Sequence, residues 1–390
     1  MEYLHGETLK TDVSALADRI GSRPAGHPEE AEARAYLREQ LQARGITDIE
    51  EIAFPTIDTW GYALIIPALL TVTGGLIGLT GGIGNIIGSL ITLFGLYHLW
   101  QSTTGAVQYQ VLYPLYPKYP AGGNILARIP AAQEPKQRVV LIGHIDSNKH
   151  RLSFSALFKR SLQAATSFML LAAALLLVAI LLNVQVLILL CTLAVGFSTF
   201  ILILDELSGF VDGANDNASA VACTLGIGKQ AARQPFQNTE IWLAFTGSEE
   251  VGLIGMNAML DKYTSELRDA WFIDFELVGS GRLAYVERHS GLTYFNPYYP
   301  DSDSVTLARE TSQAHPECQI TGENVVILEE IATLRRRGLR GICLVGLDDT
   351  GWLPNWHRYS DNSANIEAAA LERAAQFAWF MIETLDRRKS

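Results

Sequence analysis

Two long stretches without charged side chains dominate the hydrophobic pattern of this chain. Residues 59–117 and residues 161–204 contain no Asp, Glu, Lys or Arg. The first stretch is divided near Gly81-Gly82 and the second at 183–185. Each half approaches the roughly 20 residues that an α-helix needs to cross a bilayer. We therefore predict four transmembrane helices arranged as two hairpins.

Glycines in the first stretch support this interpretation. Gly74 and Gly78, like Gly84 and Gly88, are four residues apart. This spacing of small residues lets two helices approach closely in lipid. The alternative is a helical hairpin buried in a soluble core.

The rest of the chain alternates between short apolar strands and amphipathic helices. Strands are predicted at 49–54, 138–144, 240–245, 270–279 and 341–347. Helices are predicted at 8–45 with a break at 21–28, at a segment that begins near Asn217, near 324–337 and in the C-terminal tail. Such alternation predicts an α/β fold, with a mixed, mostly parallel sheet sandwiched by helices.

Composition narrows the possible functions. A net charge of −11 and the absence of a basic groove pattern argue against nucleic-acid binding. The four cysteines are scattered and form no CxxC pair, so neither a disulfide framework nor a thiolate zinc site is indicated.

Two adjacent carboxylates follow one of the buried strands. The strand at 240–245 leads through Thr246-Gly247-Ser248 to Glu249 and Glu250 in a Gly-rich turn. Carboxylates are rarely buried unless they are paired or bind a metal. One of the two could ligate a metal while the other acts as a general base, although a solvated turn is the simpler explanation of the pair taken by itself.

Other metal-capable side chains also follow strands or turns. His144 ends the strand at 138–144, Glu276 lies near the end of 270–279, Asp216 precedes a helix, and His357 follows the strand at 341–347. Open α/β sheets place their sites at the carboxyl ends of strands. We therefore expect these side chains to meet at one edge of the sheet.

The motifs around these residues resemble those of a known family. GHIDS at 143–147, GANDNAS at 213–219, GSEE at 247–250, DFELVG at 274–279 and WHRYSDNSANI at 356–366 occur in the order typical of the co-catalytic zinc aminopeptidases, metallopeptidase family twenty-eight. That family includes bacterial leucine aminopeptidases, glutaminyl cyclases and glutamate carboxypeptidase. The resemblance covers residues 8–58, 119–150 and 208–388 and implies the fold of a zinc aminopeptidase.

The resemblance implies a site with two zinc ions, for which Co²⁺ or Mn²⁺ could substitute. Asp216 would bridge the two ions, His144 and Glu276 would complete one ligand shell, and Glu250 and His357 would complete the other. One carboxylate can hold two ions about 3.5–4 Å apart. The resemblance also implies a cis peptide bond between Asp216 and Asn217.

Two further residues have expected catalytic roles. Glu249 would take a proton from the attacking water and return it to the leaving amine. Asp146 lies two residues after His144, on the same side of an extended chain, so its carboxylate can accept the other imidazole N–H.

This chain departs from the family pattern at two positions. Glu276 stands where the family usually has Asp, and Ala220 stands where Gly is usual. Neither change removes a ligand, so a catalytically inactive relative is disfavoured.

Aromatic residues flank His357. Trp352, Trp356 and Tyr359 could form a wall of the substrate pocket or belong to the core. The remaining histidines outside the apolar stretches, His289 among them, do not belong to a motif with other potential metal ligands. They are expected at the surface.

The chain is thus expected to be one catalytic domain interrupted by two membrane hairpins. The domain would comprise residues 1–58, 118–160 and 205–390, and the hairpins residues 59–117 and 161–204. The expected function is a membrane-embedded di-zinc aminopeptidase that releases N-terminal residues from peptides. The alternatives are a glutaminyl-cyclase-like acyltransferase with one zinc and a non-catalytic membrane interaction protein on a peptidase fold.

The expected partners are a peptide substrate and the lipid bilayer, and the sequence leaves the oligomeric state open. A multi-pass membrane protein with its catalytic domain on the cytoplasmic face is predicted from the positive-inside bias. The start of the chain lacks the apolar run of a cleavable signal peptide. The basic residues that flank the helices on the catalytic side are Lys118, Lys149, Arg151, Lys159 and Arg160.

Overall fold

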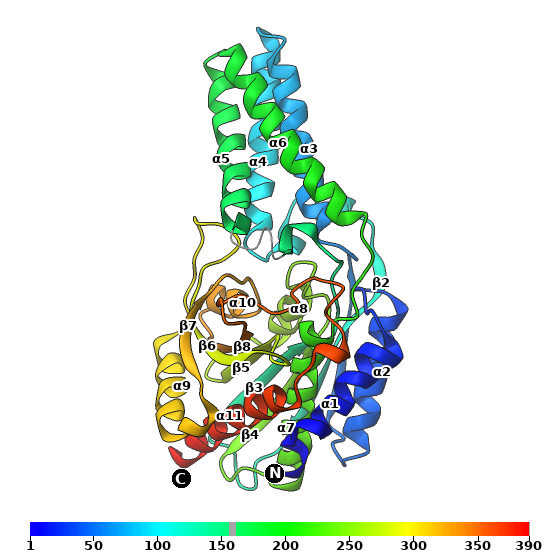
Figure 1. Ribbon diagram of the computed structural model, residues 1–390, viewed down its shortest axis with the longest axis vertical. Coiled ribbons are helices and arrows are strands. Elements are labelled where there is room, and N and C mark those ends of the chain that lie inside the picture. The colour runs from blue at the N-terminus through cyan, green and yellow to red at the C-terminus, as the bar shows by residue number, and fades with distance from the viewer. Residues whose placement is uncertain (156–160, 390) are drawn as a thin grey trace.

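The computed structural model describes residues 1–155 and 161–389, and within them one sheet holds eight strands. Their order across the sheet is β1-β2-β4-β3-β5-β8-β6-β7 (Figure 1). The strands are Ile49–Thr56 (β1), Tyr119–Ile129 (β2), Gln137–His144 (β3), Thr239–Thr246 (β4), Trp271–Glu276 (β5), Arg282–His289 (β6), Thr321–Val325 (β7) and Arg340–Leu347 (β8).

Four adjacent strands, β4, β3, β5 and β8, run parallel in the centre of the sheet. β2 is antiparallel to both β1 and β4, whereas β6 is antiparallel to β8 and parallel to β7. The central strands are buried along almost their whole length, as their continuous apolar sequences require. Because they are parallel, their carboxyl ends meet at one edge.

Helices cover both faces of the sheet. Val139 and Leu141 of β3 belong to one core and Val140 and Ile142 to the other, the alternation expected of a strand buried on both sides. The first core is completed by α1 (Gly6–Ser14), α2 (Pro28–Gln42), α7 (Ser219–Arg233), α9 (Ser302–Ala314) and α11 (Ala368–Arg387), and the second by α8 (Ile254–Tyr263) and α10 (Ile331–Arg336). The predicted mixed, mostly parallel α/β fold is confirmed.

One predicted helix is shorter than expected. The segment near 324–337 begins as strand β7, which pairs with β6, and only Ile331–Arg336 is helical. Pairing with a neighbouring strand therefore decides the structure of Thr321–Val325, which the local pattern did not indicate.

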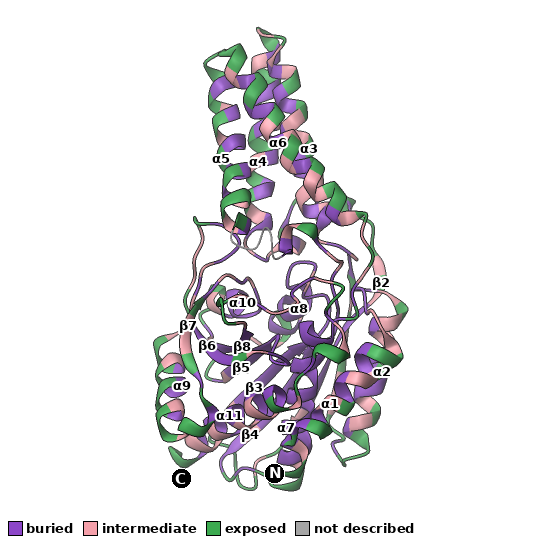
Figure 2. Ribbon diagram, viewed as in Figure 1, coloured by how far each residue is buried: buried purple, intermediate pink, exposed green. Residues whose placement is uncertain are grey.

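Four apolar helices project together from one end of the sheet domain (Figure 1). They are α3 (Gly61–Gly78), α4 (Ile83–Ser102), α5 (Leu162–Leu181) and α6 (Gln185–Glu206), and each is long and apolar enough to cross a membrane. Their outer faces are exposed although they are apolar, as Leu90, Leu175 and Phe197 illustrate (Figure 2). Such exposed apolar faces do not fit a hairpin buried in a soluble core.

The turns at 79–82 and 182–184 separate the helices of each pair, close to the two predicted breaks. The predicted domain boundaries themselves stay a prediction. The boundary at 160, with Lys159 and Arg160, lies outside the described residues.

Glycines allow close contact between α3 and α4. A Cβ atom on Gly88 would lie 2.5 Å from the carbonyl oxygen of Gly74 and 2.9 Å from the backbone nitrogen of Gly78. Backbones packed this closely leave no room for a side chain, which is the physical role predicted for small residues spaced by four.

We expect Gly88→Ala to destabilise the helical bundle by about 1–3 kcal/mol, the usual cost of overpacking. Gly196→Ala is the matched control, because a Cβ there would find only Val72 Cγ2, at 4.0 Å. Alanine also favours helix more than glycine by about 1 kcal/mol, so the control should be neutral or stabilising. Thermal unfolding of both variants in detergent tests this, and equal midpoints would contradict it.

Candidate metal centre

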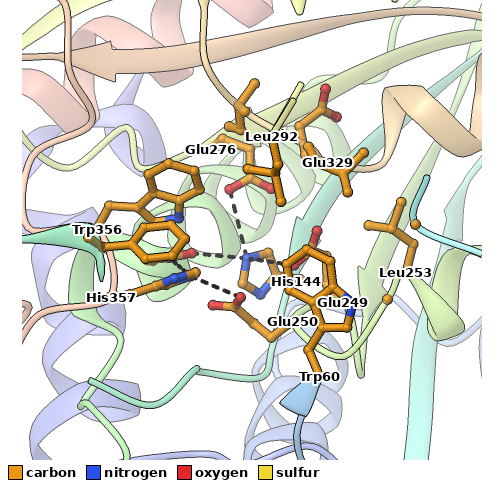
Figure 3. A pocket seen from close by; sticks show the side chains of 16 residues that line it. Trp60, His144, Glu249, Glu250, Leu253, Glu276, Leu292, Glu329, Trp356 and His357 are labelled. Carbon is orange, nitrogen blue, oxygen red and sulfur yellow. Dashed lines mark hydrogen bonds and ion pairs between the residues drawn. The ribbon is translucent and has the colours of Figure 1, made fainter. Parts of the chain in front are cut away.

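The predicted site residues lie at the carboxyl edge of the four central strands. His144 is the last residue of β3 and Glu276 the last of β5. Glu249 and Glu250 follow β4 directly, and His357 lies in the loop after β8. Asp216 lies in the turn just before α7. The parallel arrangement therefore brings side chains far apart in the sequence to one place (Figure 3).

Asp216 is the centre of this group. Its Oδ1 lies 3.2 Å from His144 Nε2, and its Oδ2 lies 3.3 Å from His357 Nε2. The Oε2 atom of Glu276 is 3.8 Å from His144 Nε2, and Oε2 of Glu250 is 3.0 Å from His357 Nε2. Two groups of potential ligands result, His144–Asp216–Glu276 and Asp216–Glu250–His357, and they share Asp216.

Glu249 stands beside this pair of groups rather than inside either. Its Oε2 is 3.9 Å from His144 Nε2, and the side chain is 8% exposed. Figure 3 shows it next to His144 and across from Glu276. The structure thus brings all six predicted metal and base residues together.

The backbone around the site has an unusual conformation at several points. Ser248, Leu277 and His357 have φ values of +57°, +50° and +51°. Positive φ is uncommon for residues other than glycine and is concentrated at functional sites. The peptide bond between Asp216 and Asn217 is cis, as the family resemblance implied.

Buried polar groups hold the two loops that carry His144 and Asp216. The fully buried Arg23 donates from Nε to the carbonyl of Ile145 at 2.7 Å and from Nη2 to that of Gly213 at 2.8 Å. Asp361 accepts hydrogen bonds from the backbone N–H of Asn215 and of Asp216. A charged donor and a charged acceptor, both away from water, therefore position the two segments.

Burial in this site disfavours the charged form of its carboxylates. It raises the pKa of Glu249, Glu250 and Glu276, and neighbouring carboxylates raise the pKa of Glu249 further. Burial acts to lower the pKa of His357, but Glu250 and Asp216 outweigh it and raise that pKa to about 9. Concentrated negative charge in a dry site is what a bound cation relieves.

The donor set fits zinc. Glu250 Oε1, Glu276 Oε1 and His357 Nδ1 are buried and have no hydrogen-bond partner among the described residues. Unpaired buried carboxylate oxygens are costly unless an ion or a ligand pairs with them. Imidazole and carboxylate ligands suit Zn²⁺.

The Asp146 carboxylate lies beside the His144 imidazole, as expected, and also contacts the main chain of the Glu249-Glu250 turn. Its carboxylate accepts the backbone N–H of Glu249 at 3.0 Å and that of Glu250 at 3.1 Å. Nδ1 of His144 lies 3.0 Å from the main-chain carbonyl oxygen of Asp146 and 3.5 Å from its carboxylate. The carboxylate therefore positions the Glu249-Glu250 turn, and the carbonyl is the nearer partner of the imidazole.

A pocket of about 40 Å³ opens on this site, and we call it the site pocket. Trp356 lines it, but two other expected wall residues do not. Trp352 packs against Trp356, with ring centroids 5.7 Å apart, and Tyr359 is 57% exposed and stacks on His150. The apolar wall is completed by residues that sequence reasoning missed, namely Trp60, Phe154, Leu253, Leu292, Ile327 and Leu328.

A second group of buried acids lies behind Glu276 and was also missed. Carboxylate oxygens of Asp274, Glu276 and Glu330 lie within 4.8 Å of one another. The prediction that His289 lies at the surface was wrong, because it is fully buried and its Nε2 is 2.6 Å from Glu329 Oε1. Glu329-Glu330 repeats the double carboxylate of Glu249-Glu250, which was the available signal in the sequence.

Comparison with known proteins supports the family resemblance. The model of Peptidase family M28 matches residues 196–382. The resemblance to family M28 is confirmed. The match supports a hydrolase of the peptidase class, and none of the curated proteins matches the chain.

Solved structures share the fold of this M28 relative at low sequence identity. A zinc aminopeptidase from Bacillus subtilis has a TM-score of 0.59 at 12% identity, with 98% of this chain and 95% of that chain covered. A glutaminyl cyclase from Bacteroides thetaiotaomicron has a TM-score of 0.57 at 14% identity, with 97% of both chains covered. A Zn-dependent exopeptidase from Parabacteroides distasonis has a TM-score of 0.55 at 14% identity, with 96% of both chains covered.

We expect Asp146→Asn to weaken metal binding by about 10–100-fold, the usual effect of losing a group that orients ligands. The amide that replaces one carboxylate oxygen cannot accept an N–H, so the Glu249-Glu250 turn loses one of its two anchors. Zinc titration against a competing chelator measures the change. Asp48→Asn, at a largely exposed residue that pairs with Arg128, is the control. Unchanged zinc affinity in Asp146→Asn would rule out this positioning role.

Proposed function

We propose that this protein is a membrane-embedded di-zinc aminopeptidase that hydrolyses N-terminal residues from peptides. The observation that carries the proposal is the position of Asp216, whose two oxygens face two different histidines. Two groups of potential ligands that share one carboxylate are the arrangement expected of a two-metal site. His144 and Glu276 would hold one zinc, Glu250 and His357 the other, and Asp216 both.

In this proposal the metals supply Lewis-acid chemistry, polarising the scissile carbonyl and lowering the pKa of water. Glu249 is the general base. It takes a proton from the attacking water and delivers that proton to the nitrogen of the leaving amine. Burial, and after it the neighbours Glu250 and Glu276, raise the pKa of Glu249, which favours proton uptake.

The rest of the chain would assist this reaction. Asp146 holds the turn that carries the base, and the apolar wall around Trp60, Leu253 and Trp356 limits the access of water. Residues 1–58, 118–160 and 205–390 would form the catalytic domain, and residues 59–117 and 161–204 the two membrane hairpins.

A glutaminyl-cyclase-like acyltransferase with one zinc is the second candidate. It is favoured by the glutaminyl cyclases among the structures with this fold. Metal analysis separates the candidates, because the aminopeptidase would bind two zinc ions per chain and the cyclase one. A non-catalytic membrane interaction protein is less favoured, because Glu249 and the five candidate ligands lie together.

We expect Glu249→Gln to retain both zinc ions and to lower kcat by at least about 100-fold, because an amide cannot take up the proton. A fluorogenic aminoacyl substrate in detergent measures turnover, and metal analysis of the same sample shows whether the site is intact. Chelation should abolish the wild-type activity, and added Zn²⁺ should restore it. Retained turnover in Glu249→Gln would exclude Glu249 as the base.

We also propose that the catalytic domain faces the cytoplasm. The four candidate spans would cross the bilayer and return to one side. Lys118 contacts the rings of Tyr113 and Tyr116. Lys149 and Arg151 form ion pairs with Glu206. Three of the flanking basic residues therefore lie beside the ends of the helices. The positive-inside rule places such residues on the cytoplasmic side.

Cysteine labelling tests this orientation. A cysteine at Thr80, in the turn of the first hairpin, should react with a membrane-impermeant reagent added to intact cells or spheroplasts. A cysteine at Lys389 should react only after lysis. The four native cysteines are buried, so they provide a low background. The reverse pattern would place the peptidase outside the cell.

A further inference from the structure

One loop of the sheet domain reaches the base of the helical bundle. Residues 290–300, between β6 and α9, read SGLTYFNPYYP and contain no charged side chain. Figure 1 shows this loop, in yellow, rising to the lower end of α5. We call it the aromatic loop, because it contains Tyr294, Phe295, Tyr298 and Tyr299.

Three of these aromatic side chains are unusually exposed. Tyr294, Phe295 and Tyr299 are 60%, 45% and 56% exposed, whereas the ring of Tyr298 stacks on that of His289. A rigid loop that holds large apolar surface in the open, without packing it on the protein, is typical of an interaction site.

The other exposed apolar side chains of the sheet domain lie at the same end. Among the described residues outside 61–102 and 162–206, Met1 is the one exposed large apolar or aromatic residue that does not adjoin the bundle. The exposed surface of α9, by contrast, carries polar residues such as Asp303, Arg309 and Gln313. The residues that adjoin the bundle, besides those of the aromatic loop, are Tyr109, Val111 and Leu115 after α4, Leu152 before α5, Leu207 after α6, and Tyr359, which contacts Gly209.

Hydrogen bonds hold the aromatic loop against the bundle. At its base, His289 and Tyr298 exchange two backbone hydrogen bonds of 2.9 Å. Gln163 of α5 donates from Nε2 to the carbonyls of Ser290 and Gly291, both at 3.0 Å. On the other side, Asn296 Nδ2 donates to the carbonyl of Thr103, just after α4, at 2.8 Å. The position of the loop is therefore fixed relative to two of the candidate spans.

One further contact gives the height of the loop along the bundle. The backbone N–H of Tyr294 donates to Ser167 Oγ at 3.0 Å. Ser167 follows Leu162, the first residue of α5, by five residues, which is about 8 Å along a helix. The 20 residues of α5 extend about 30 Å, the thickness of the hydrocarbon core. If α5 crosses a bilayer, the tip of the aromatic loop lies level with the boundary of the hydrocarbon.

The chemistry of the loop fits that level. Tyrosine is enriched where headgroups meet acyl chains, because its ring is apolar and its hydroxyl is polar. Phe168, next to Ser167, is 55% exposed, so the apolar outer face of α5 begins beside the aromatic loop. This continuity with a surface of the candidate spans favours lipid over a protein as the partner of the loop.

We propose that the aromatic loop inserts Tyr294 and Phe295 into the headgroup region of the bilayer, as a membrane contact of the sheet domain in addition to the four helices. Leu292 of the same loop lines the site pocket, so this contact fixes the distance between the metal centre and the bilayer surface. The inference rests on the membrane embedding in the proposed function, and it is independent of the peptidase chemistry.

Depth-dependent fluorescence quenching tests the proposal. Full-length single-cysteine variants are labelled with the fluorophore NBD in detergent and placed in phosphatidylcholine nanodiscs, one chain per disc. The native cysteines are buried and give a low background. We expect the label of Phe295→Cys to lie about 15 Å from the bilayer centre, at the edge of the hydrocarbon core. A lipid with a nitroxide near its headgroup should therefore quench it more than a lipid with a nitroxide near the chain end.

Two variants are the controls. Leu90→Cys, on the exposed face of α4, should be quenched more strongly by the deep nitroxide than by the shallow one. Gln313→Cys, on the exposed surface of α9, should be quenched by neither, because it faces water.

The outcomes separate this inference from the proposed embedding. If the label at Leu90 is quenched and the label at Phe295 behaves like that at Gln313, the helices cross the bilayer and the loop does not touch it. If none of the three labels is quenched, the embedding fails and the loop contact fails with it. A blue shift at Phe295 that appears only when several chains share one vesicle would identify a second copy as the partner and overturn the proposal.

Discussion

Negative charge collected at the dry edge of a parallel sheet is the constraint on which this structure depends. Asp216, Glu249, Glu250 and Glu276 are buried together, and burial raises the pKa of the three glutamates. Such a group is stable only if protons or cations compensate it. The buried Arg23, the carboxylates that accept backbone N–H groups and the positive-φ residues all serve to hold these side chains together despite their repulsion. The same side chains form the candidate ligand groups at this edge, so a bound cation would relieve the repulsion.

The parts of this site that could be predicted are those that strands position directly. A strand of continuous apolar residues ends at a known edge, so His144, Glu249, Glu250 and Glu276 could be placed together from the pattern alone. Residues carried by loops could not be placed from the pattern alone, and Asp216 and His357 were expected there only through the family resemblance. Leu292, in the connection between β6 and α9, and Glu329, in the short one between β7 and α10, were missed. The carboxylate of Asp146 also faces main-chain N–H groups that no sequence pattern reveals. β6, α8 and α9 were also not predicted, because their short mixed sequences acquire structure only from tertiary contacts.

Strand direction explains why the helical bundle stands next to the metal centre. β1 is antiparallel to β2, and β2 is antiparallel to β4, so β1 runs in the same direction as β4 and β3. The first hairpin follows β1 and the second follows β3, and both therefore leave the sheet at the carboxyl edge that carries the site. Trp60, immediately before α3, lines the site pocket for this reason. Insertion at two equivalent strand ends is enough to bring the helical bundle and the candidate metal centre together.

The two hairpins are also joined to the metal centre by polar contacts. Glu206, the last residue of α6, accepts a hydrogen bond from Thr59 ahead of α3 at 2.6 Å and pairs with Arg151 at 2.7 Å. Arg151 in turn bonds Asn148, whose Nδ2 donates to Glu250 at 2.7 Å. Three contacts thus connect the base of the bundle to a proposed zinc ligand. Because all of these groups are buried or half-buried, a shift of α6 must either break a charged hydrogen bond or move Glu250. The bundle therefore helps to position the candidate metal centre.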